Sequence, residues 1–314
     1  MLIRSAFSTL LAFIAVAPLA AQSSEAPTVR LSGYLQARET WQEHIGLTAS
    51  INRARLGAAG TVAPAVTYRL QAEFRTGSVG TGRASVSLTD AYVRFARSQW
   101  TVQAGQFKTP FAGEYIMSLA DVETADRAAV VDSLAPKRDI GLMGEYAAGK
   151  LVTVSAGVFN GEGTNLTSNA DSTVLGVARV AVRPVAHLTL ALDGARYFGD
   201  STRYGAEAAY ADERFVVRGE YLGQSRDLAG TADDKGWYLL GAAAVVPAIQ
   251  LMGRYEEFER PGVSDQAKIR GWSLGANVRP FGPSTRFTLE YLSRKAGDPG
   301  VRRGRLLAQA QVKY

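Results

Sequence analysis

Arginine and lysine side chains supply the chemistry that this sequence is best equipped to perform. Nine of them are candidates for binding anions, because they fall on the polar side of alternating runs or within one long connection. A guanidinium group can bind two oxygens of a phosphate or carboxylate at once. The candidates are Arg53, Arg55, Arg69, Arg75 and Arg94 in the early part of the chain, and Lys108, Arg127, Lys137 and Arg138 in the long connection.

Carboxylates in the same connection are alternative partners for these cations. Buried or half-buried charges usually have a partner of opposite sign. The cations could therefore bind a solute, or pair with the acids and hold the connection in place. The two alternatives are compatible if the connection is an acidic loop inside a pore and the cations lie on the pore wall opposite it. The acids of the segment 106–139 are Glu114, Asp121, Glu123, Asp126, Asp132 and Asp139.

Catalytic and metal-binding residues are scarce. The chain has no cysteine and only two histidines, His44 and His187, and neither histidine lies near a nucleophile motif. The adjacent acids Asp233 and Asp234 are too few for a calcium site. The excess of basic residues is spread along the chain and forms no nucleic-acid-type cluster. We therefore expect no enzyme activity, no cofactor, no metal and no nucleic-acid partner.

The N-terminus has the pattern of a secretory signal. Arg4 precedes the apolar run Leu10 to Leu19, and small residues follow it. The apolar run is too short to span a bilayer. We expect residues 1–21 to be a signal peptide, with the cut between positions 20 and 23, and residues 22–314 to form a single domain.

Sixteen runs in the rest of the chain alternate between apolar and polar residues. In Val66 to Arg75, the apolar residues fall on one face and Thr67, Arg69, Gln71 and Glu73 on the other. A period of two over about ten residues is typical of a membrane β-strand. The runs are 29–41, 48–59, 66–75, 87–95, 100–105, 140–146, 151–159, 172–182, 188–198, 203–210, 215–224, 236–246, 249–258, 270–279, 285–293 and 304–314.

The connections between these runs alternate in length. The longer ones are near 41–47, 75–86, 106–138, 160–171, 225–235, 259–269 and 294–303, and only Gly199 to Thr202 is short where a long one is due. Short periplasmic turns and long external loops are the asymmetry of outer-membrane barrels. The pattern predicts an all-β fold, a sixteen-stranded antiparallel transmembrane β-barrel. A soluble β-sandwich is the alternative, but it gives no reason for the alternating lengths.

The third long connection, 106–139, carries no strand-like alternation. Connections of this length are usually functional or disordered, and this one is not of low complexity. We expect it to fold inward and form a constriction. Ser118 and Asp121 have the spacing of a weak helix-capping pair, which favours a short helix over Val122 to Leu134.

Four stretches resemble the phosphate-selective porin O and P family. They are INRARLG (51–57), LTDAYVRF (88–95), GQFKTPF (105–111) and KRDIG (137–141). The resemblance implies a sixteen-stranded outer-membrane barrel, commonly trimeric, with an internal third loop. The family's basic substrate ladder is not matched residue by residue, and this chain is shorter than the best-known members.

Together these features predict a porin of the bacterial outer membrane for passive diffusion of small solutes. The basic candidates favour an anion preference, and the resemblance implies phosphate or similar oxyanions. The expected partners are outer-membrane lipid and lipopolysaccharide, small anionic solutes and two further copies of the chain. The alternative is a non-conducting or plugged barrel that acts as a structural or binding protein.

Overall fold

The computed structural model describes residues 27–76, 82, 84–169, 172–227, 232–261, 268–297 and 301–314. The expected signal peptide, 1–21, lies outside the described residues.

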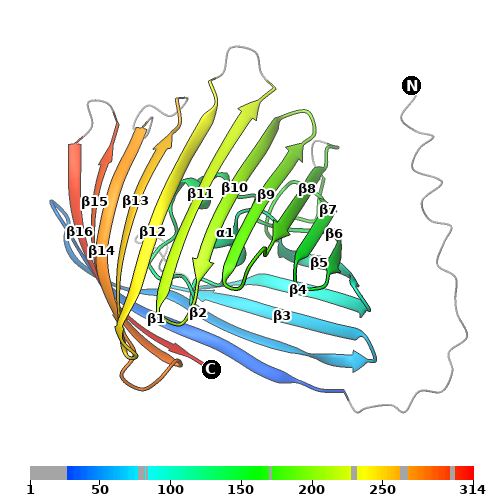
Figure 1. The fold of residues 1–314 in the computed structure, drawn as a ribbon, viewed down its shortest axis with the longest axis horizontal. Coiled ribbons are helices and arrows are strands. Elements are labelled where there is room, and N and C mark those ends of the chain that lie inside the picture. Colours follow the sequence, from blue (N-terminus) through cyan, green and yellow to red (C-terminus); the bar gives the residue numbers. More distant parts are fainter. Residues whose placement is uncertain are drawn as a thin grey trace, which may run out of the picture.

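The described chain forms one closed antiparallel β-barrel of sixteen strands, as the sequence predicts (Figure 1). Each strand pairs with its neighbours in the sequence, and β1 pairs with β16 from Tyr34–Lys313 to Gln42–Arg305. The strands are β1 Arg30–Gln42, β2 Gly46–Ala63, β3 Val66–Arg75, β4 Ser85–Arg97, β5 Trp100–Lys108, β6 Arg138–Ala148, β7 Val152–Phe159, β8 Leu175–Val182, β9 Leu188–Tyr197, β10 Ser201–Ala211, β11 Phe215–Arg226, β12 Asp234–Val246, β13 Ile249–Glu259, β14 Lys268–Val278, β15 Thr285–Ala296 and β16 Val301–Lys313.

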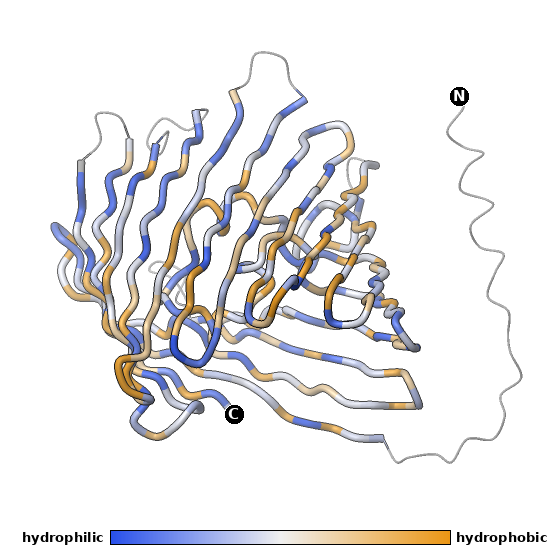
Figure 2. The backbone as a smooth tube through the Cα atoms, viewed as in Figure 1, coloured by the Kyte–Doolittle hydropathy of each residue, from blue (hydrophilic) through white to orange (hydrophobic). Residues whose placement is uncertain are grey.

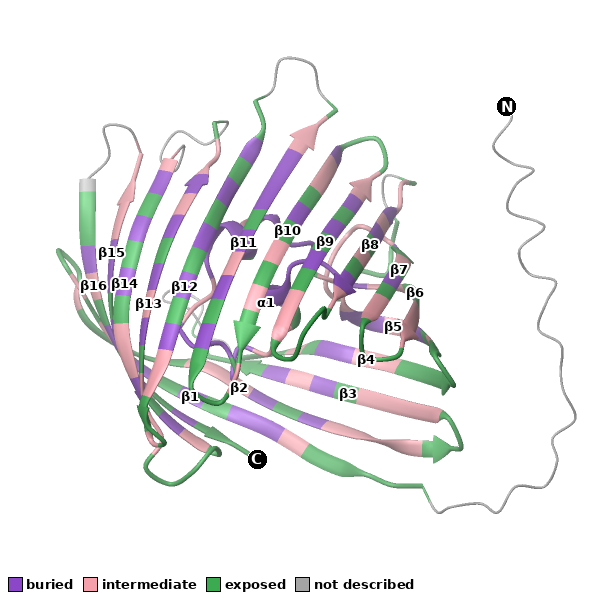
Figure 3. Ribbon diagram, viewed as in Figure 1, coloured by how far each residue is buried: buried purple, intermediate pink, exposed green. Residues whose placement is uncertain are grey.

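The two faces of the barrel wall differ in polarity and exposure. In β12, Trp237 and Leu239 are 38% and 53% exposed, whereas Tyr238 and Leu240 are buried. The alternation recurs along the strands in hydropathy (Figure 2) and in burial (Figure 3). Successive side chains of a strand point to opposite faces. The apolar outer face suits lipid, and the inner face carries most of the buried charged residues.

The connections at the two ends of the barrel differ in length. At one end they are tight, such as 64–65, 98–99 and 247–248. At the other end they include 76–84, 109–137 and 160–174. For β8 to β16 this end is at the top of Figure 1. Two of the predicted long loops are short in the structure, so these two predictions are wrong. The strands extend into 41–47 and 294–303 and leave only the connections 43–45 and 297–300.

The long segment 109–137 contains two short helices, α1 Gly113–Ile116 and α2 Ala129–Leu134. The predicted helix Val122 to Leu134 is therefore wrong over its first half. The physical reason is that the backbone of this half bonds to the barrel wall: the Ala125 amide donates to Glu290 of β15, at 2.7 Å. Among the described residues, no helix is long and apolar enough to cross a membrane.

An apolar cluster joins α2 to one part of the wall. Val130, Val131 and Leu134 are almost wholly buried, and they belong to the same cluster as Leu222, Leu240, Met252 and Phe258 of β11 to β13. These wall residues lie on the inner face of the barrel. Inner-face residues that contact a water-filled channel are expected to be polar. Apolar inner-face residues therefore mark the part of the wall on which the segment packs.

Candidate functional site

The backbone of segment 109–137 bonds to inner-face side chains of many strands. Its amides donate to wall carboxylates: Ala112 to Asp193 of β9, Glu114 to Glu220 of β11, and Ala129 to Glu256 of β13. Buried backbone groups need such partners. Its carbonyls accept from the wall as well, at Ala120 (Gln311), Val122 (Arg286), Glu123 (Asn277), Ala125 (Arg38), Asp126 (Arg254) and Leu134 (Arg203). The polar inner faces of β1, β9–β11 and β13–β16 are thus largely engaged by the segment.

Acidic side chains of the segment pair with the same part of the wall. Glu123 bonds to Arg218 of β11 at 2.9 Å. Asp126 bonds to Arg38 of β1 at 3.0 Å and lies 3.6 Å from Arg305 of β16. The segment is therefore fixed by ion pairs as well as by its backbone. The remaining pairs are Asp121 with Lys313, Glu114 with Arg254 and, within the segment, Asp132 with Lys137.

Two cations hold the carbonyl end of α1. The last carbonyls of a helix have no partner inside it. Lys108 Nζ donates to the carbonyls of Ile116 and Met117 at 3.0 and 2.7 Å. Arg127 donates to those of Glu114, Tyr115 and Met117. Both cations also lie over the Tyr115 ring, so they stabilise the tip of the segment.

Glu114 is a carboxylate buried at the centre of this arrangement. It is fully buried, one of its oxygens accepts from the Ala128 amide at 2.9 Å, and the other lies 3.8 Å from Arg254. Burial raises the pKa of the Glu114 carboxyl above its usual value, and the Arg254 charge opposes the shift only in part. Docking of α1 is therefore linked to proton binding at this position.

A cavity of about 920 Å³ lies between residues 107–118 and the inner face of β2 to β11. It extends to the tight turn 183–187 and to the end of β10 at Ala211. Its lining includes eight basic residues and only three acidic ones, Asp90, Glu145 and Glu207. The basic residues are Arg55, Arg69, Arg94, Lys108, Arg138, Arg179, Arg183 and Arg218. The open part of the interior is therefore positively charged.

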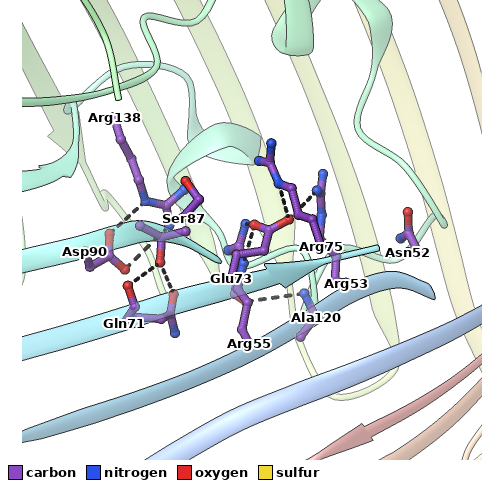
Figure 4. Close-up of polar contacts among 12 residues, drawn as sticks. Asn52, Arg53, Arg55, Gln71, Glu73, Arg75, Ser87, Asp90, Ala120 and Arg138 are labelled. Carbon is purple, nitrogen blue, oxygen red and sulfur yellow. Dashed lines mark hydrogen bonds and ion pairs between the residues drawn. The ribbon is translucent and has the colours of Figure 1, made fainter. Parts of the chain in front are cut away.

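Two wall carboxylates organise the arginines near the start of the cavity (Figure 4). Glu73 is 1% exposed and pairs with Arg53 at 2.7 Å, Arg55 at 2.5 Å and Arg75 at 3.4 Å. Asp90 pairs with Arg138 at 2.7 Å and lies 3.5 Å from Arg69. In both clusters the cations outnumber the acid, so positive charge is left over.

Three lining cations have no carboxylate partner within the described part of the chain. Arg94 donates to the amide oxygen of Gln103 at 2.8 Å and lies over the Tyr92 ring. Arg183 has one long contact, 3.5 Å, to the Thr153 hydroxyl. Lys108 bonds only to carbonyls. Arg94 and Arg183 are the ones best able to attract an anion, because no fixed negative charge cancels theirs, whereas the Lys108 amine is engaged by two carbonyls and the Tyr115 ring.

The structure brings five of the nine predicted cations together on the cavity and separates the others. Arg55, Arg69, Arg94, Lys108 and Arg138 line it. Arg53 and Arg75 lie outside its lining and pair with Glu73, Arg127 is bonded into the loop, and Lys137 pairs with Asp132. The predicted acids Glu114, Asp121, Glu123, Asp126 and Asp132 do not line the described cavity.

Of the two alternatives for the early arginines, pairing with the loop acids is not the one seen in the described residues. Arg53, Arg55, Arg69 and Arg75 pair with wall acids of β3 and β4. The loop acids pair with cations of β1, β11, β13 and β16 or of the loop itself. The physical reason is position. The segment leans on one part of the wall, whereas β2 to β4 face the open space.

Sequence reasoning missed lining residues on later strands. Arg179 pairs with Asp193 at 2.7 Å and with Glu207, and Arg218 reaches the cavity from β11. Arg179 shares the phase of the inward Val177 and Ala181 in an alternating run. That phase identifies Arg179 as an inward-facing residue.

Three of the four motifs meet where segment 109–137 leaves and rejoins the wall, and the fourth, 51–57, contributes Arg55 to the cavity lining. The Thr109 hydroxyl donates to the Pro136 carbonyl at 2.8 Å, which joins the two ends of the segment. Arg138 and Asp90 form the ion pair beside them. Asp139 accepts from the Gly161 amide at 2.7 Å. Among the residues with described positions, no three His, Cys, Asp or Glu side chains are grouped as a metal site requires.

Comparisons with solved structures support the fold. The trimer form of the in-vitro folded outer-membrane protein OmpT of Vibrio cholerae superposes with a TM-score of 0.69 at 15% identity, over 92% of this chain and 100% of that one. The anion-selective porin from Comamonas acidovorans gives 0.68 at 14% identity, over 92% and 100%. A mutant Rh. blastica porin gives 0.61 at 15% identity, over 91% and 100%.

The sequence itself matches a family model over half its length. No curated protein matches the sequence. The model of the phosphate-selective porin O and P family matches residues 35–191, which contain all four motifs and most of the cavity lining. With the barrel fold, this match indicates an outer-membrane location. The chain belongs to the phosphate-selective porin O and P family of bacterial outer-membrane porins.

Proposed function

We propose that this porin conducts small solutes by passive diffusion and prefers anions. The observation that carries the proposal is the cavity between residues 107–118 and β2–β11, with eight basic and three acidic residues in its lining. Clefts lined by one sign of charge raise the local concentration of ions of opposite sign. Fixed basic side chains in a pore favour anions in the same way.

The segment 109–137 acts as the constriction loop in this proposal. It bonds to β1, β9–β11 and β13–β16, which lie around much of the closed barrel, and a segment inside the barrel can reach all of them at once. These contacts leave the cavity beside β2 to β11 as the path. Anions then pass Arg94 before they reach the tight turns.

Phosphate or a similar oxyanion is the proposed preferred solute. Family membership supports it, and the Comamonas relative of similar fold is an anion-selective porin. The chemistry agrees, because Arg94 and Arg183 keep guanidinium donors free of carboxylates, and guanidinium groups suit oxyanions. A trimer is the proposed assembly, since the OmpT structure with this fold was determined in its trimer form.

Planar-bilayer recording tests the proposal. We expect stepwise conductance and, in asymmetric KCl, a reversal potential that shows chloride to be more permeant than potassium. Added phosphate should reduce the chloride current by competing for the same cations. A protein that inserts and never conducts would contradict the proposal and favour a plugged barrel that serves another role. A protein that conducts and selects cations would contradict the proposed anion preference.

A further inference from the structure

A row of charged side chains crosses the outer face of β13 to β16 near the longer connections. Glu257 of β13 is the direct cross-strand partner of Arg270 of β14. Arg270 is the partner of Lys295 of β15, and Lys295 is the partner of Arg302 of β16. Directly opposite residues share one face of a sheet. The row lies near the upper left edge of the barrel in Figure 1.

The neighbouring positions show that this row points outward. Two residues along the strands, Tyr255 and Trp272 are again cross-strand partners, and they are 39% and 37% exposed. Residues of the opposite phase are buried or bond inward, as Arg294 does with Glu256 at 2.5 Å. Arg270 and Lys295 therefore face the surroundings of the barrel, away from the cavity.

The charges in the row do not balance. Glu257 is the only acid, and it is shared between Arg270 at 3.3 Å and the Tyr255 hydroxyl at 2.6 Å. Arg302 bonds to the hydroxyl of Ser293 at 3.0 Å, and Lys295 has no ion-pair partner among the described residues. Like charges directly opposite each other destabilise a sheet. An anion from outside the chain would relieve the repulsion between Lys295 and Arg302.

Aromatic residues fix the depth of the row. The rings of Trp272 and Tyr291 lie 5.6 Å apart, and those of Trp237 and Tyr255 lie 5.5 Å apart, on the same outer face. Such aromatic belts sit at the level of the lipid head groups. The row lies at this belt and beyond it, toward the end of the barrel with the longer connections, which is the external end of an outer-membrane barrel.

We propose that Arg270, Lys295 and Arg302 bind the phosphate groups of a phosphorylated glycolipid in the outer leaflet of the outer membrane. Adjacent strands are about 4.8 Å apart, so the three cations span about 10 Å across the wall. Guanidinium groups flank the ammonium group and can each bind two phosphate oxygens. Trp272 and Tyr291, below the row, would pack against the acyl chains.

Native mass spectrometry of the purified full-length protein tests this site, with lipid A that carries both phosphates as the probe. We expect the double variant Lys295→Gln/Arg302→Gln to bind about 30-fold more weakly than the wild type, from the usual increment for two basic residues at an anionic surface. The matched control is Arg97→Gln/Lys150→Gln, which removes two exposed cations at the opposite end of the barrel. This control should bind lipid A as the wild type does.

Two further arms use the wild-type protein alone and do not depend on the variant folding. Fully dephosphorylated lipid A should bind weakly, and inorganic phosphate should not displace lipid A at equal concentration. Equal binding of both lipids, or equal binding by the double variant, would overturn the proposal. Displacement by inorganic phosphate would show a site for the free anion. Loss of the oligomer in the lipid-free double variant would show a contact between copies of the chain.

Discussion

Replacing Arg94 by glutamine removes one uncompensated charge from the proposed path. The side chain lines the cavity and bonds to Gln103, and no carboxylate among the described residues cancels its charge. A unit charge about 5 Å from a passing ion contributes about 0.8 kcal/mol in water. Screening over a Debye length of about 10 Å at 0.1 M salt lowers this to about 0.5 kcal/mol. The anion loses this stabilisation and the cation is freed of an equal repulsion, so the chloride-to-potassium permeability ratio should fall about fivefold.

The assay is the reversal potential of single channels in a tenfold KCl gradient. Arg97→Gln is the control, because it removes the same charge from the same strand on the outer face, opposite the exposed Trp100. We expect the control to keep the wild-type ratio. An unchanged reversal potential for Arg94→Gln, or an equal shift in both variants, would refute the assignment of Arg94 to the path. Repeating the measurement in 1 M KCl should shrink the difference, because the Debye length falls to about 3 Å.

Three other substitutions test interactions that stabilise the barrel around the cavity. Each is measured as the temperature at which the protein changes from the fast electrophoretic mobility of the folded barrel to the slow mobility of the unfolded chain. Gly105→Ala should destabilise the barrel by about 1–3 kcal/mol, because φ is +123° and a Cβ would lie 2.2 Å from the Ala91 carbonyl, whereas Gly144→Ala meets open space and should be neutral. Glu73→Gln should cost about 3–5 kcal/mol, since it leaves the buried Arg55 guanidinium and the partly exposed Arg53 without their carboxylate, and a neutral result would contradict the ion-pair account. Burial raises the pKa of Glu114 in the folded protein, so the wild type loses stability as the pH rises above 4.5. Glu114→Gln lacks this carboxyl and should therefore become more stable relative to the wild type over the same pH range. Melting temperatures that change in parallel with pH in the two proteins would contradict this.

The barrel strands could be predicted because the alternation of apolar and polar residues within each strand is visible in a short stretch of sequence. Alternation in runs such as Val66 to Arg75 specifies the strand and its face at once, and the observed β3 has these bounds. Strand ends were harder to predict. Polar residues such as Arg302 and Arg303 look like loop in the sequence, yet they pair across β15 and β16. Pairing with a neighbouring strand supplies their backbone hydrogen bonds, and one strand's sequence does not reveal that.

The position of the long segment could not be predicted for a different reason. Each charged residue of the segment can pair with any inner-face residue of opposite charge. The early arginines were candidates because they are near the segment in the sequence. The structure pairs Glu123 with Arg218 and Asp126 with Arg38, which are close only after the barrel closes. Apolar inner-face residues such as Leu240 and Met252 were the available signal, since they break the polar phase where α2 packs.

Cysteine accessibility measures the central claim most directly, since the natural sequence has no cysteine. Thr153→Cys places a thiol on the cavity wall beside Arg183, and Thr288→Cys places one at a buried inner-face position of β15 that does not line the cavity. We predict that an anionic methanethiosulfonate reagent blocks current through the Thr153 variant, reacts with it faster than a cationic reagent, and leaves the Thr288 variant unaffected. Block of the Thr288 variant alone, or faster reaction of Thr153→Cys with the cationic reagent, would contradict a basic path along β2 to β11.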